Sequence, residues 1–138
     1  MQSQSLIYGL PVSMTLDCDE LLHAPQVAFE TYGDPKAPRG ALLLLHGLSR
    51  SHSALQGTPE GGRVHYSPDA WFTQVMGPGK AIDTDKYFVI CPNLLGGCRG
   101  TTGPGSLNPE TKKPYGRDFP TITLADMVTV EKMLVDRL

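Results

Sequence analysis

Residues 40–53 read GALLLLHGLSRSHS, an apolar run that ends abruptly at His46-Gly47 and passes into small polar residues. A strand that helices cover on both faces of a parallel sheet is continuously apolar rather than alternating, and residues 41–45 have this pattern. In open α/β sheets the functional residues lie just beyond the carboxyl ends of such strands. The sequence therefore predicts a buried parallel strand at 41–45 and a functional loop from His46 to Arg50.

Three other segments have the composition of strands. Met14 to Asp17 is short, and Val27 to Tyr32 alternates between two faces before the turn residues Gly33-Asp34-Pro35. Tyr87 to Cys91 is a second continuous apolar run, which Pro92 follows, and it predicts another buried strand.

Two segments predict helices. Ser67-Pro68-Asp69 offers an N-cap followed by proline at the first helical position, and Gly77-Pro78-Gly79 would end this helix, whose inner side would carry Trp71, Phe72 and Val75. Thr123 and Asp126 have capping-box spacing, which predicts a helix to the end of the chain with an inner stripe of Leu124, Met127, Val128, Leu134 and Leu138. The alternation of strands and helices predicts the α/β class, with a mostly parallel sheet flanked by helices.

Length and composition fit one soluble domain. The 138 residues hold 12 basic and 14 acidic side chains with no run of basic residues, so the sequence gives no sign of the positive charge that nucleic-acid binding uses. No apolar run approaches the roughly 20 residues that span a bilayer, and the first residues do not read as a signal peptide. Cys18, Cys91 and Cys98 lack CxxC spacing, so neither a disulfide framework nor a metal site is indicated.

The sequence offers no convincing nucleophile. Residues 47–51, GLSRS, have the first glycine of a G-x-S-x-G turn but not the second, and they open a loop rather than a strand-to-helix turn. Cys98 would need a histidine partner to act as a thiolate, and a small residue in a tight turn is the favoured interpretation. His46 is interpreted as structural, because a general base needs a nucleophile within hydrogen-bond reach.

The loop after the leucine strand has a second interpretation as part of an oxyanion hole. In α/β-hydrolases a loop at this place lends a backbone N–H that stabilises the charge of a tetrahedral intermediate. The donor here would be Leu48, and Gly47 would let the chain turn sharply and approach the substrate. From these residues alone, a dipeptide that merely ends a strand is an equally good interpretation.

Three blocks of sequence resemble the amino-terminal part of the homoserine O-acetyltransferase family, acyltransferases on the α/β-hydrolase fold. They are residues 42–53, residues 71–123, which include GPGKAIDTDKYFVIC and NLLGGCRGTTGP, and residues 125–138. The resemblance runs from about Val27 to the last residue. It implies the oxyanion role for the Leu48 amide, and it places the Asn93 to Gly103 loop at the rim of the substrate pocket.

The resemblance also implies a reaction. A serine would take the acetyl group from acetyl-CoA, and the hydroxyl of L-homoserine would then attack the acyl-enzyme, a step of methionine synthesis. In that family the serine follows the helix that ends here at Leu138, and its Asp and His partners come much later. We therefore expect residues 1–138 to be one partial domain, truncated before the nucleophile strand and inactive alone. No bound cofactor or metal, a cytoplasmic location and a homodimer of the full-length enzyme are also implied.

Other interpretations remain open from the sequence. The same fold could transfer a succinyl group or use serine as the acceptor. In a different class, the Gly- and Pro-rich loop 92–116 could serve a non-catalytic module that binds a protein partner. If the strand after the last helix is missing, strand 41–45 would expose an unpaired apolar edge, so the isolated chain is expected to be poorly soluble or dependent on a partner.

Overall fold

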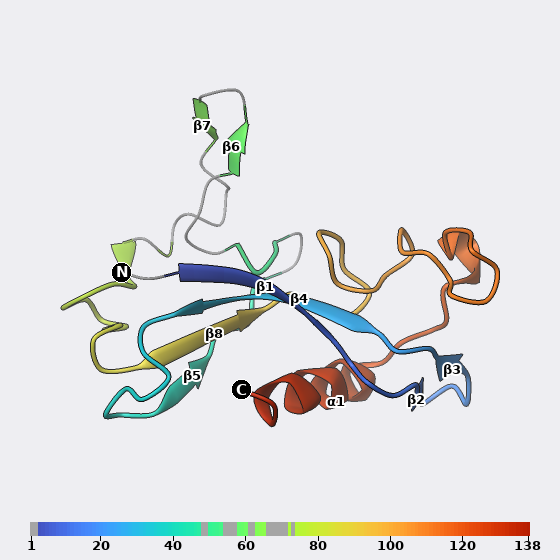
Figure 1. Ribbon diagram of the computed structural model, residues 1–138, viewed down its shortest axis with the longest axis horizontal. Helices are drawn as coiled ribbons and strands as arrows, with labels where there is room; N and C mark the ends of the chain where they lie inside the picture. Colours follow the sequence, from blue (N-terminus) through green and yellow to red (C-terminus); the bar gives the residue numbers. More distant parts are fainter. Residues whose placement is uncertain (1–2, 48–49, 54–57, 61–62, 66–71, 73) are drawn as a thin grey trace. The chain divides into compact units, whose positions relative to one another are not determined.

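The structure is a computed structural model of residues 1–138, and it describes all of them except 1–2, 48–49, 54–57, 61–62, 66–71 and 73. The described elements are β1 (Ser3–Gly9), β2 (Met14–Thr15), β3 (Leu21–Leu22), β4 (Gln26–Tyr32), β5 (Ala41–Leu43), β6 (Thr58–Glu60), β7 (Arg63–His65), β8 (Phe88–Pro92), the 3₁₀ turn η2 (Gly116–Asp118) and α1 (Leu124–Val135) (Figure 1). Within these described parts no helix is long and apolar enough to cross a membrane.

The main sheet has the strand order β1-β4-β8-β5 and is mixed. β8 runs parallel to β5, with Leu42 opposite Val89, and antiparallel to β4, with Glu30 opposite Cys91. The expectation of a mostly parallel sheet is therefore wrong for the described strands. The reason lies in the connections: residues 33–40 are too few for a crossover and reverse the chain after β4, whereas residues 44–87 are enough for a parallel return.

Strands β4 and β8 are the central pair of this sheet, and both are buried. Every residue of β8 is buried, as the apolar run predicted, and so is every residue of β4 after Gln26. The predicted alternation in β4 is wrong, because a strand with a neighbour on each side and cover on both faces has no solvent-facing set of side chains. A glutamate, Glu30, is thereby enclosed.

Strand β5 is buried on one face only. Leu42 and Leu44 pack against a core of Tyr32, Met76, Val89 and Cys91, whereas Leu43 and Leu45 are 46% and 53% exposed. The strand is shorter than the predicted 41–45, although the Leu44 amide still donates to Ile90 O at 2.8 Å. The expected cover on both faces is therefore absent among the described residues, and β5 also stands at the end of the strand order.

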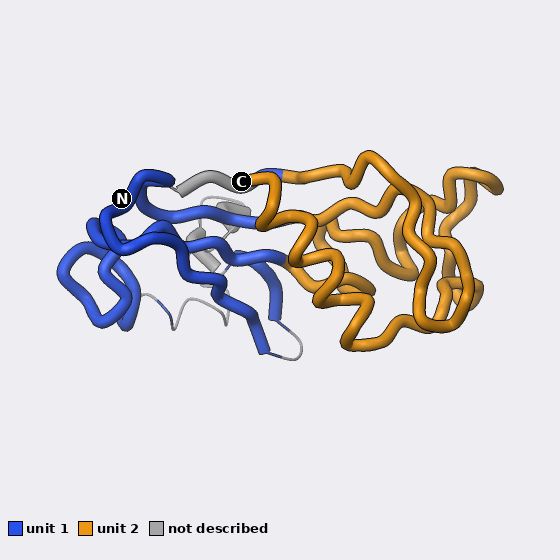
Figure 2. The backbone as a smooth tube through the Cα atoms, turned by 90° about the horizontal axis from the view of Figure 1, so that it is seen from below, with its two compact units in different colours: residues 1–6, 29–92 blue, residues 7–28, 93–138 orange. Residues whose placement is uncertain are grey.

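The chain divides into two compact units that interleave in sequence (Figure 2). One contains residues 1–6 and 29–92, and the other contains residues 7–28 and 93–138. The first holds the core around Tyr32 and the antiparallel pair of β6 and β7, a stretch for which the sequence analysis predicts neither a strand nor a helix. The predicted helix at 67–77 falls largely outside the described residues, although Phe72 packs against the core of this unit.

The second unit contains α1, whose start was predicted correctly. Thr123 Oγ1 accepts from the Asp126 amide at 3.2 Å, and Asp126 Oδ2 accepts from the Thr123 amide at 2.8 Å, so the capping box is complete. The predicted inner stripe is largely wrong: Leu124 and Val128 are 79% and 66% exposed, while Asp126, Val130, Glu131 and Leu134 are buried. Asp126 also accepts from the Asp17 amide at 3.0 Å, which turns this side of the helix inward.

The loop after β8 is fixed by hydrogen bonds to the first half of β4. Backbone amides of Asn93 and Thr102 donate to Ala28 O and Gln26 O, each at 2.8 Å. In return, the Ala28 amide donates to the Thr101 hydroxyl at 3.0 Å. The loop thus takes over the hydrogen-bonding role that a neighbouring strand would have, and these bonds satisfy backbone groups of β4 that would otherwise be unpaired.

Candidate functional site

The loop that follows β5 is held at its two sides by short-range hydrogen bonds. The Arg50 amide donates to Gly47 O at 3.1 Å, and the His46 ring nitrogen Nδ1 lies 3.0 Å from the same oxygen. Leu48, the predicted oxyanion donor, lies outside the described residues, and so does Ser49. The structure therefore places Gly47 and Arg50, the described residues that flank this pair in the sequence, within hydrogen-bonding distance of each other.

Gly47 stays a predicted site residue. A Cβ built on it would meet no atom within 4 Å, and its φ is not in the left-handed region. Neither a close neighbour nor the backbone of the described structure therefore requires a glycine here. A requirement for Gly47 would have to come from a substrate or a further segment close to the loop.

The end of the same loop is buried. Ser51 and His52 are almost fully enclosed, and the Ser53 amide lies 3.5 Å from Ser51 Oγ. The polar residues around His52 in the sequence predict a solvated side chain, and this prediction is wrong, since His52 is only 6% exposed. His65 belongs to β7, and its side chain is not among those described.

A buried carboxyl group, which sequence reasoning missed, lies beneath this loop. Glu30 on β4 is only 3% exposed, and the Tyr32 hydroxyl donates a hydrogen bond to Glu30 Oε2. Burial raises the pKa of Glu30 above its ordinary value, while hydrogen bonds from the Tyr32 and Ser53 hydroxyls oppose that rise. The available sequence signal was a lone acidic residue, Glu30, among the apolar and aromatic residues of β4.

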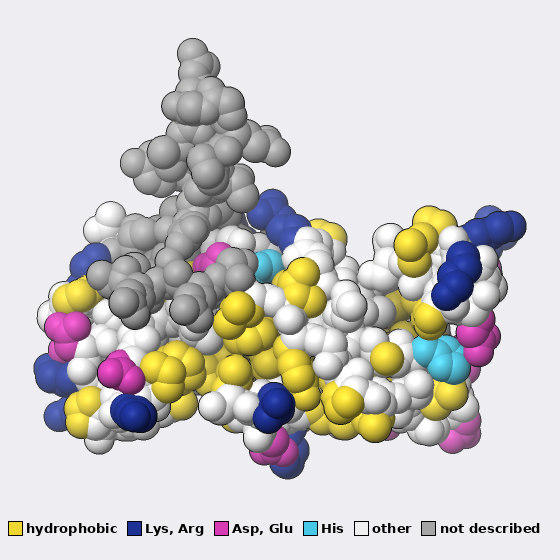
Figure 3. Space-filling model, in the orientation of Figure 1, with side chains coloured by type: hydrophobic (Ala, Val, Ile, Leu, Met, Phe, Trp, Pro, Cys, Tyr) yellow, Lys and Arg dark blue, Asp and Glu magenta, His cyan; other side chains and the backbone are white. Residues whose placement is uncertain are grey.

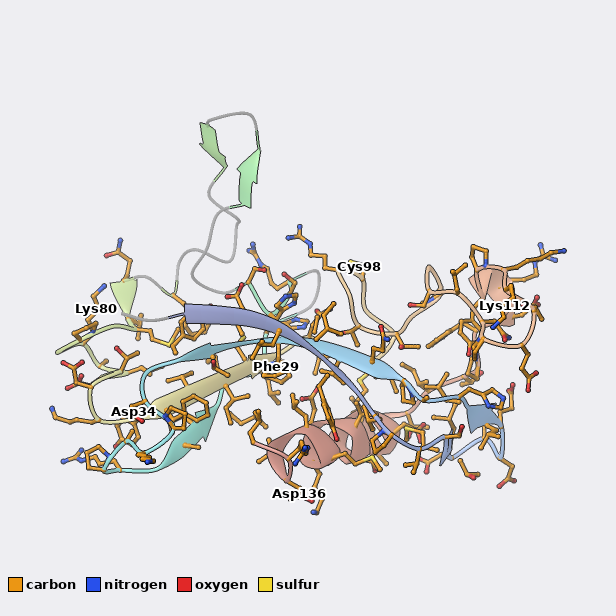
Figure 4. All side chains as sticks on the ribbon, in the orientation of Figure 1. Phe29, Asp34, Lys80, Cys98, Lys112 and Asp136 are labelled. Atoms are coloured by element: carbon orange, nitrogen blue, oxygen red, sulfur yellow. The ribbon has the colours of Figure 1, made fainter. Side chains whose placement is uncertain are left out.

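The loop between Asn93 and Gly103, predicted to be a pocket rim, belongs to the second unit. Asn93 is buried, and its side-chain amide donates to Cys98 O. Cys98 and Arg99 are exposed, with Cys98 labelled on this loop in Figure 4 and Arg99 in the left-handed region at φ 67°. A cavity of about 210 Å³ is lined by Gly97, Cys98, Arg99, Gly100, Thr101, Gly105 and Ser106.

A larger cavity, of about 440 Å³, lies in the same unit. Its lining comprises His23, Ala24, Gln26, Gly100, Thr102, Ser106, Leu107, Pro109 and Tyr115. His23 Nε2 lies 3.0 Å from a carboxylate oxygen of Glu110. In the part of the chain that the structure describes, no group of three or more His, Cys, Asp or Glu side chains is arranged to hold a metal ion.

The mixed sheet and the loop at the end of its edge strand define part of an α/β-hydrolase fold, and solved structures support this class. Homoserine O-acetyltransferase from Bacillus anthracis superposes with a TM-score of 0.81 at 31% identity over 99% of this chain and 37% of that one. Esterase E22 superposes with a TM-score of 0.77 at 32% identity, over 99% of this chain and 38% of that one.

Sequence relatives narrow the class to a family. Homoserine O-acetyltransferase of Methanococcus vannielii is 47% identical over 132 residues, which cover 95% of this chain and 26% of that protein. Homoserine O-succinyltransferase of Alkalilimnicola ehrlichii is 44% identical over 139 residues, which cover all of this chain and 35% of that protein. No protein-family model matches. The chain is thus related to the homoserine O-acetyltransferase family, as its sequence predicted, and spans about a quarter to a third of its relatives' length.

Proposed function

We propose that this chain forms the oxyanion-loop part of a homoserine O-acyltransferase. The observation that carries the proposal is the similarity, at 44–47% identity and over nearly the whole chain, to proteins of that name. The structural support is a loop with buried anchor residues directly after the edge strand β5. Activity of a whole enzyme, a cytoplasmic location and a homodimer belong to the same proposal.

In this proposal the Leu48 amide is one of two donors to the oxyanion of a tetrahedral intermediate, and Gly47 shapes the loop. The 138 residues contain no G-x-S-x-G turn, so the serine that forms the acyl-enzyme comes from polypeptide outside this sequence. The serine oxygen attacks the acyl-CoA carbonyl, CoA leaves as the thiol, and the homoserine hydroxyl then displaces the serine. The chain taken alone is expected to be inactive.

Acetyl-CoA is the proposed donor and L-homoserine the proposed acceptor. Relatives named O-acetyltransferases match at 42–47% identity and relatives named O-succinyltransferases at 44–45%, so sequence identity does not separate the two donors and a succinyl donor is the second candidate within the same reaction class. Serine as the acceptor is a further variant of this proposal.

A chimera tests the proposal directly. Residues 1–138 would replace the matching segment of the Methanococcus vannielii homoserine O-acetyltransferase, which is 47% identical over 132 residues. We expect release of CoA from acetyl-CoA that depends on L-homoserine, with the parent enzyme as the positive control. Assays with succinyl-CoA and with L-serine identify the preferred donor and acceptor. A folded chimera without transferase activity would contradict the proposal.

An esterase is the second candidate, because esterase E22 is as similar to this chain as the Bacillus anthracis acetyltransferase, at 32% against 31% identity. The two reactions share an acyl-enzyme and differ in whether water or an alcohol attacks it. In the chimera, acyl-group hydrolysis at the same rate with and without L-homoserine would favour the esterase.

A further inference from the structure

The loop from Asn93 to Gly103 contains a run of backbone amides without acceptors. The amides of residues 98–101 donate to no acceptor in the part of the chain that the structure describes. Exposed amides can donate to water, but Thr101 is only 3% exposed. A buried backbone N–H without a partner costs free energy, so an acceptor for it is expected. The loop therefore offers several donors that its own chain leaves unused.

The conformation of this run is unusual for an arginine. Arg99 has φ 67° and Gly100 has φ 101°, so both lie in the left-handed region, where glycine is unstrained and arginine is strained. Hydrogen bonds hold the loop in this form: the Asn93 side-chain amide donates to Cys98 O, and the Thr101 hydroxyl donates to Asn93 O at 2.9 Å. Successive amides around a left-handed residue are typical of the concavities in which backbones bind anions.

The side chains beside these amides also suit an anion. The adjoining cavity of about 210 Å³ is lined in part by Arg99 and by the hydroxyl-bearing Thr101 and Ser106, and none of the described residues that line it is acidic. The exposed Arg99 side chain makes no ion pair or hydrogen bond with a described residue. Residues 93–109 contain no Asp or Glu, and Glu110, the next residue, lies 3.0 Å from a histidine nitrogen. The guanidinium group is therefore available to a ligand.

We propose that residues 97–101 form an anion-binding site, in which the amides of residues 98–101 and the Arg99 guanidinium group bind a phosphate or carboxylate group of a small molecule. Arginine and backbone N–H groups are strong donors to such charged acceptors. The anion supplies the acceptor that the Thr101 amide lacks within the described chain. If the proposed acyl transfer holds, the two sources of this group are the phosphates of acyl-CoA and the carboxylate of L-homoserine, and this assignment rests on that proposed function.

A titration of the 138-residue chain with inorganic phosphate tests the site. We expect saturable changes in the ¹H–¹⁵N signals of the amides of residues 98–101, because a hydrogen bond to an anion shifts the signal of its donor. The Lys112 amide, which donates to Asn108 O at 2.9 Å in the same unit, is the reference and should not change. Sodium chloride at equal ionic strength separates binding from screening. Acetate in place of phosphate compares a carboxylate with a phosphate.

Substitutions of Arg99 test its part in the site. Arg99→Gln removes the charge and should weaken phosphate binding by at least about tenfold, whereas Arg99→Lys keeps the charge and should lose less. Arg99→Gly also removes the charge but adopts the left-handed φ without strain, so an equal loss in both variants excludes backbone strain as the cause. Arg117→Gln, at an exposed arginine of the same unit outside the described lining, is the matched control and should bind as the parent does.

Kinetics of the chimera identify the source of the anion. Arg99→Gln should raise KM for one substrate by at least about fivefold and leave kcat nearly unchanged, because a contact away from the reacting atoms stabilises the ground state and the transition state alike. A higher KM for acetyl-CoA identifies a phosphate of the donor, and a higher KM for L-homoserine identifies the carboxylate of the acceptor. Arg117→Gln should change neither KM.

The outcomes separate the two proposals. The anion site is overturned, whatever the enzyme does, if phosphate and acetate give no saturable changes, if chloride gives equal ones, or if Arg99→Gln binds phosphate as the parent does. Unchanged KM for both substrates in an active chimera overturns the role of the site in acyl transfer. An inactive parent chimera counts against the proposed acyl transfer, and the phosphate titration then still decides the anion site.

Discussion

At the scale of single residues, Glu131 is a buried carboxyl group in an uncompensated setting. It is 5% exposed on α1, and neither carboxyl oxygen has a hydrogen-bond partner among the residues that the structure describes. Burial raises its pKa from 4.5 to about 7. The folded state binds this proton more tightly than the unfolded state does. The stability that comes from the protonated carboxyl group is therefore fully present below pH 4.5 and is lost as the pH rises through about 7.

Replacing Glu131 should therefore stabilise the protein at alkaline pH. One pKa unit corresponds to about 1.4 kcal/mol, so Glu131→Leu should raise the free energy of unfolding by up to about 3 kcal/mol at pH 8 and by much less at pH 4.5. Urea unfolding at several pH values measures this difference. Asp118→Asn, at an exposed carboxyl group, is the control. An equal effect of Glu131→Leu at both pH values would contradict the assignment.

Two glycines on the connection between β4 and β5 form a matched pair. Gly33 and Gly40 have similar backbone angles, φ 87° and 84°. A Cβ on Gly33 would lie 2.6 and 2.7 Å from the carbonyl oxygens of Tyr87 and Thr84. A Cβ on Gly40 would meet nothing within 4 Å. An alanine at either position would be held in the left-handed region of backbone angles, which costs about 1–2 kcal/mol. Gly33→Ala should lose at least about 2 kcal/mol more than Gly40→Ala in chemical unfolding. Equal losses would show that backbone angle alone matters.

At the scale of elements, the cap of α1 is the clearest test of local structure. Thr123→Ala removes the side-chain acceptor for the Asp126 amide and a donor to Asp17 Oδ2, so it should cost about 1 kcal/mol of stability. Thr129→Ala, in the middle of the same helix and exposed, should change stability by less than about 0.5 kcal/mol. Thermal unfolding of both variants measures the difference, and equal effects would argue against the cap.

Element by element, the sequence predicted what depends on local pattern. The buried strand before Pro92 and the capping box at Thr123 were both predicted, because an apolar run and a side-chain spacing suffice to define them. The buried face of α1 was not predicted, because the hydrogen bond from the Asp17 amide to Asp126 joins residues that are 109 positions apart in the sequence. The burial of Glu30 was missed for the same reason, since it depends on β4 lying between β1 and β8 in the sheet.

At the scale of the whole molecule, several large apolar side chains are exposed, and Figure 3 shows hydrophobic side chains on one face of the described surface. They include Leu43 on β5 and the α1 side chains Leu124, Val128 and Val135. Beside the free edge of β5, an exposed leucine favours association between copies of the chain. The chain's similarity to only a part of its relatives agrees with surfaces that further polypeptide would cover.

Leu43→Lys should therefore reduce aggregation of the isolated chain. A lysine on the exposed face of an edge strand opposes edge-to-edge pairing at little cost in stability. Light scattering at matched concentrations should fall relative to the parent chain. The neighbouring Leu42→Lys places the charge against the core of the first unit and should unfold it. Unchanged scattering in Leu43→Lys would locate the association elsewhere.

The position of β8 between β4 and β5 has a consequence for biosynthesis. A ribosome delivers β4 and β5 early, yet neither can gain its central neighbour until the chain has emerged beyond Pro92. Until then, β4 and β5 lack the strand that joins them, and their unpaired backbone groups and apolar side chains are open to other chains. A translational pause before β8 has left the ribosome should therefore increase misassociation of the nascent chain, whereas a pause after β8 has emerged should not.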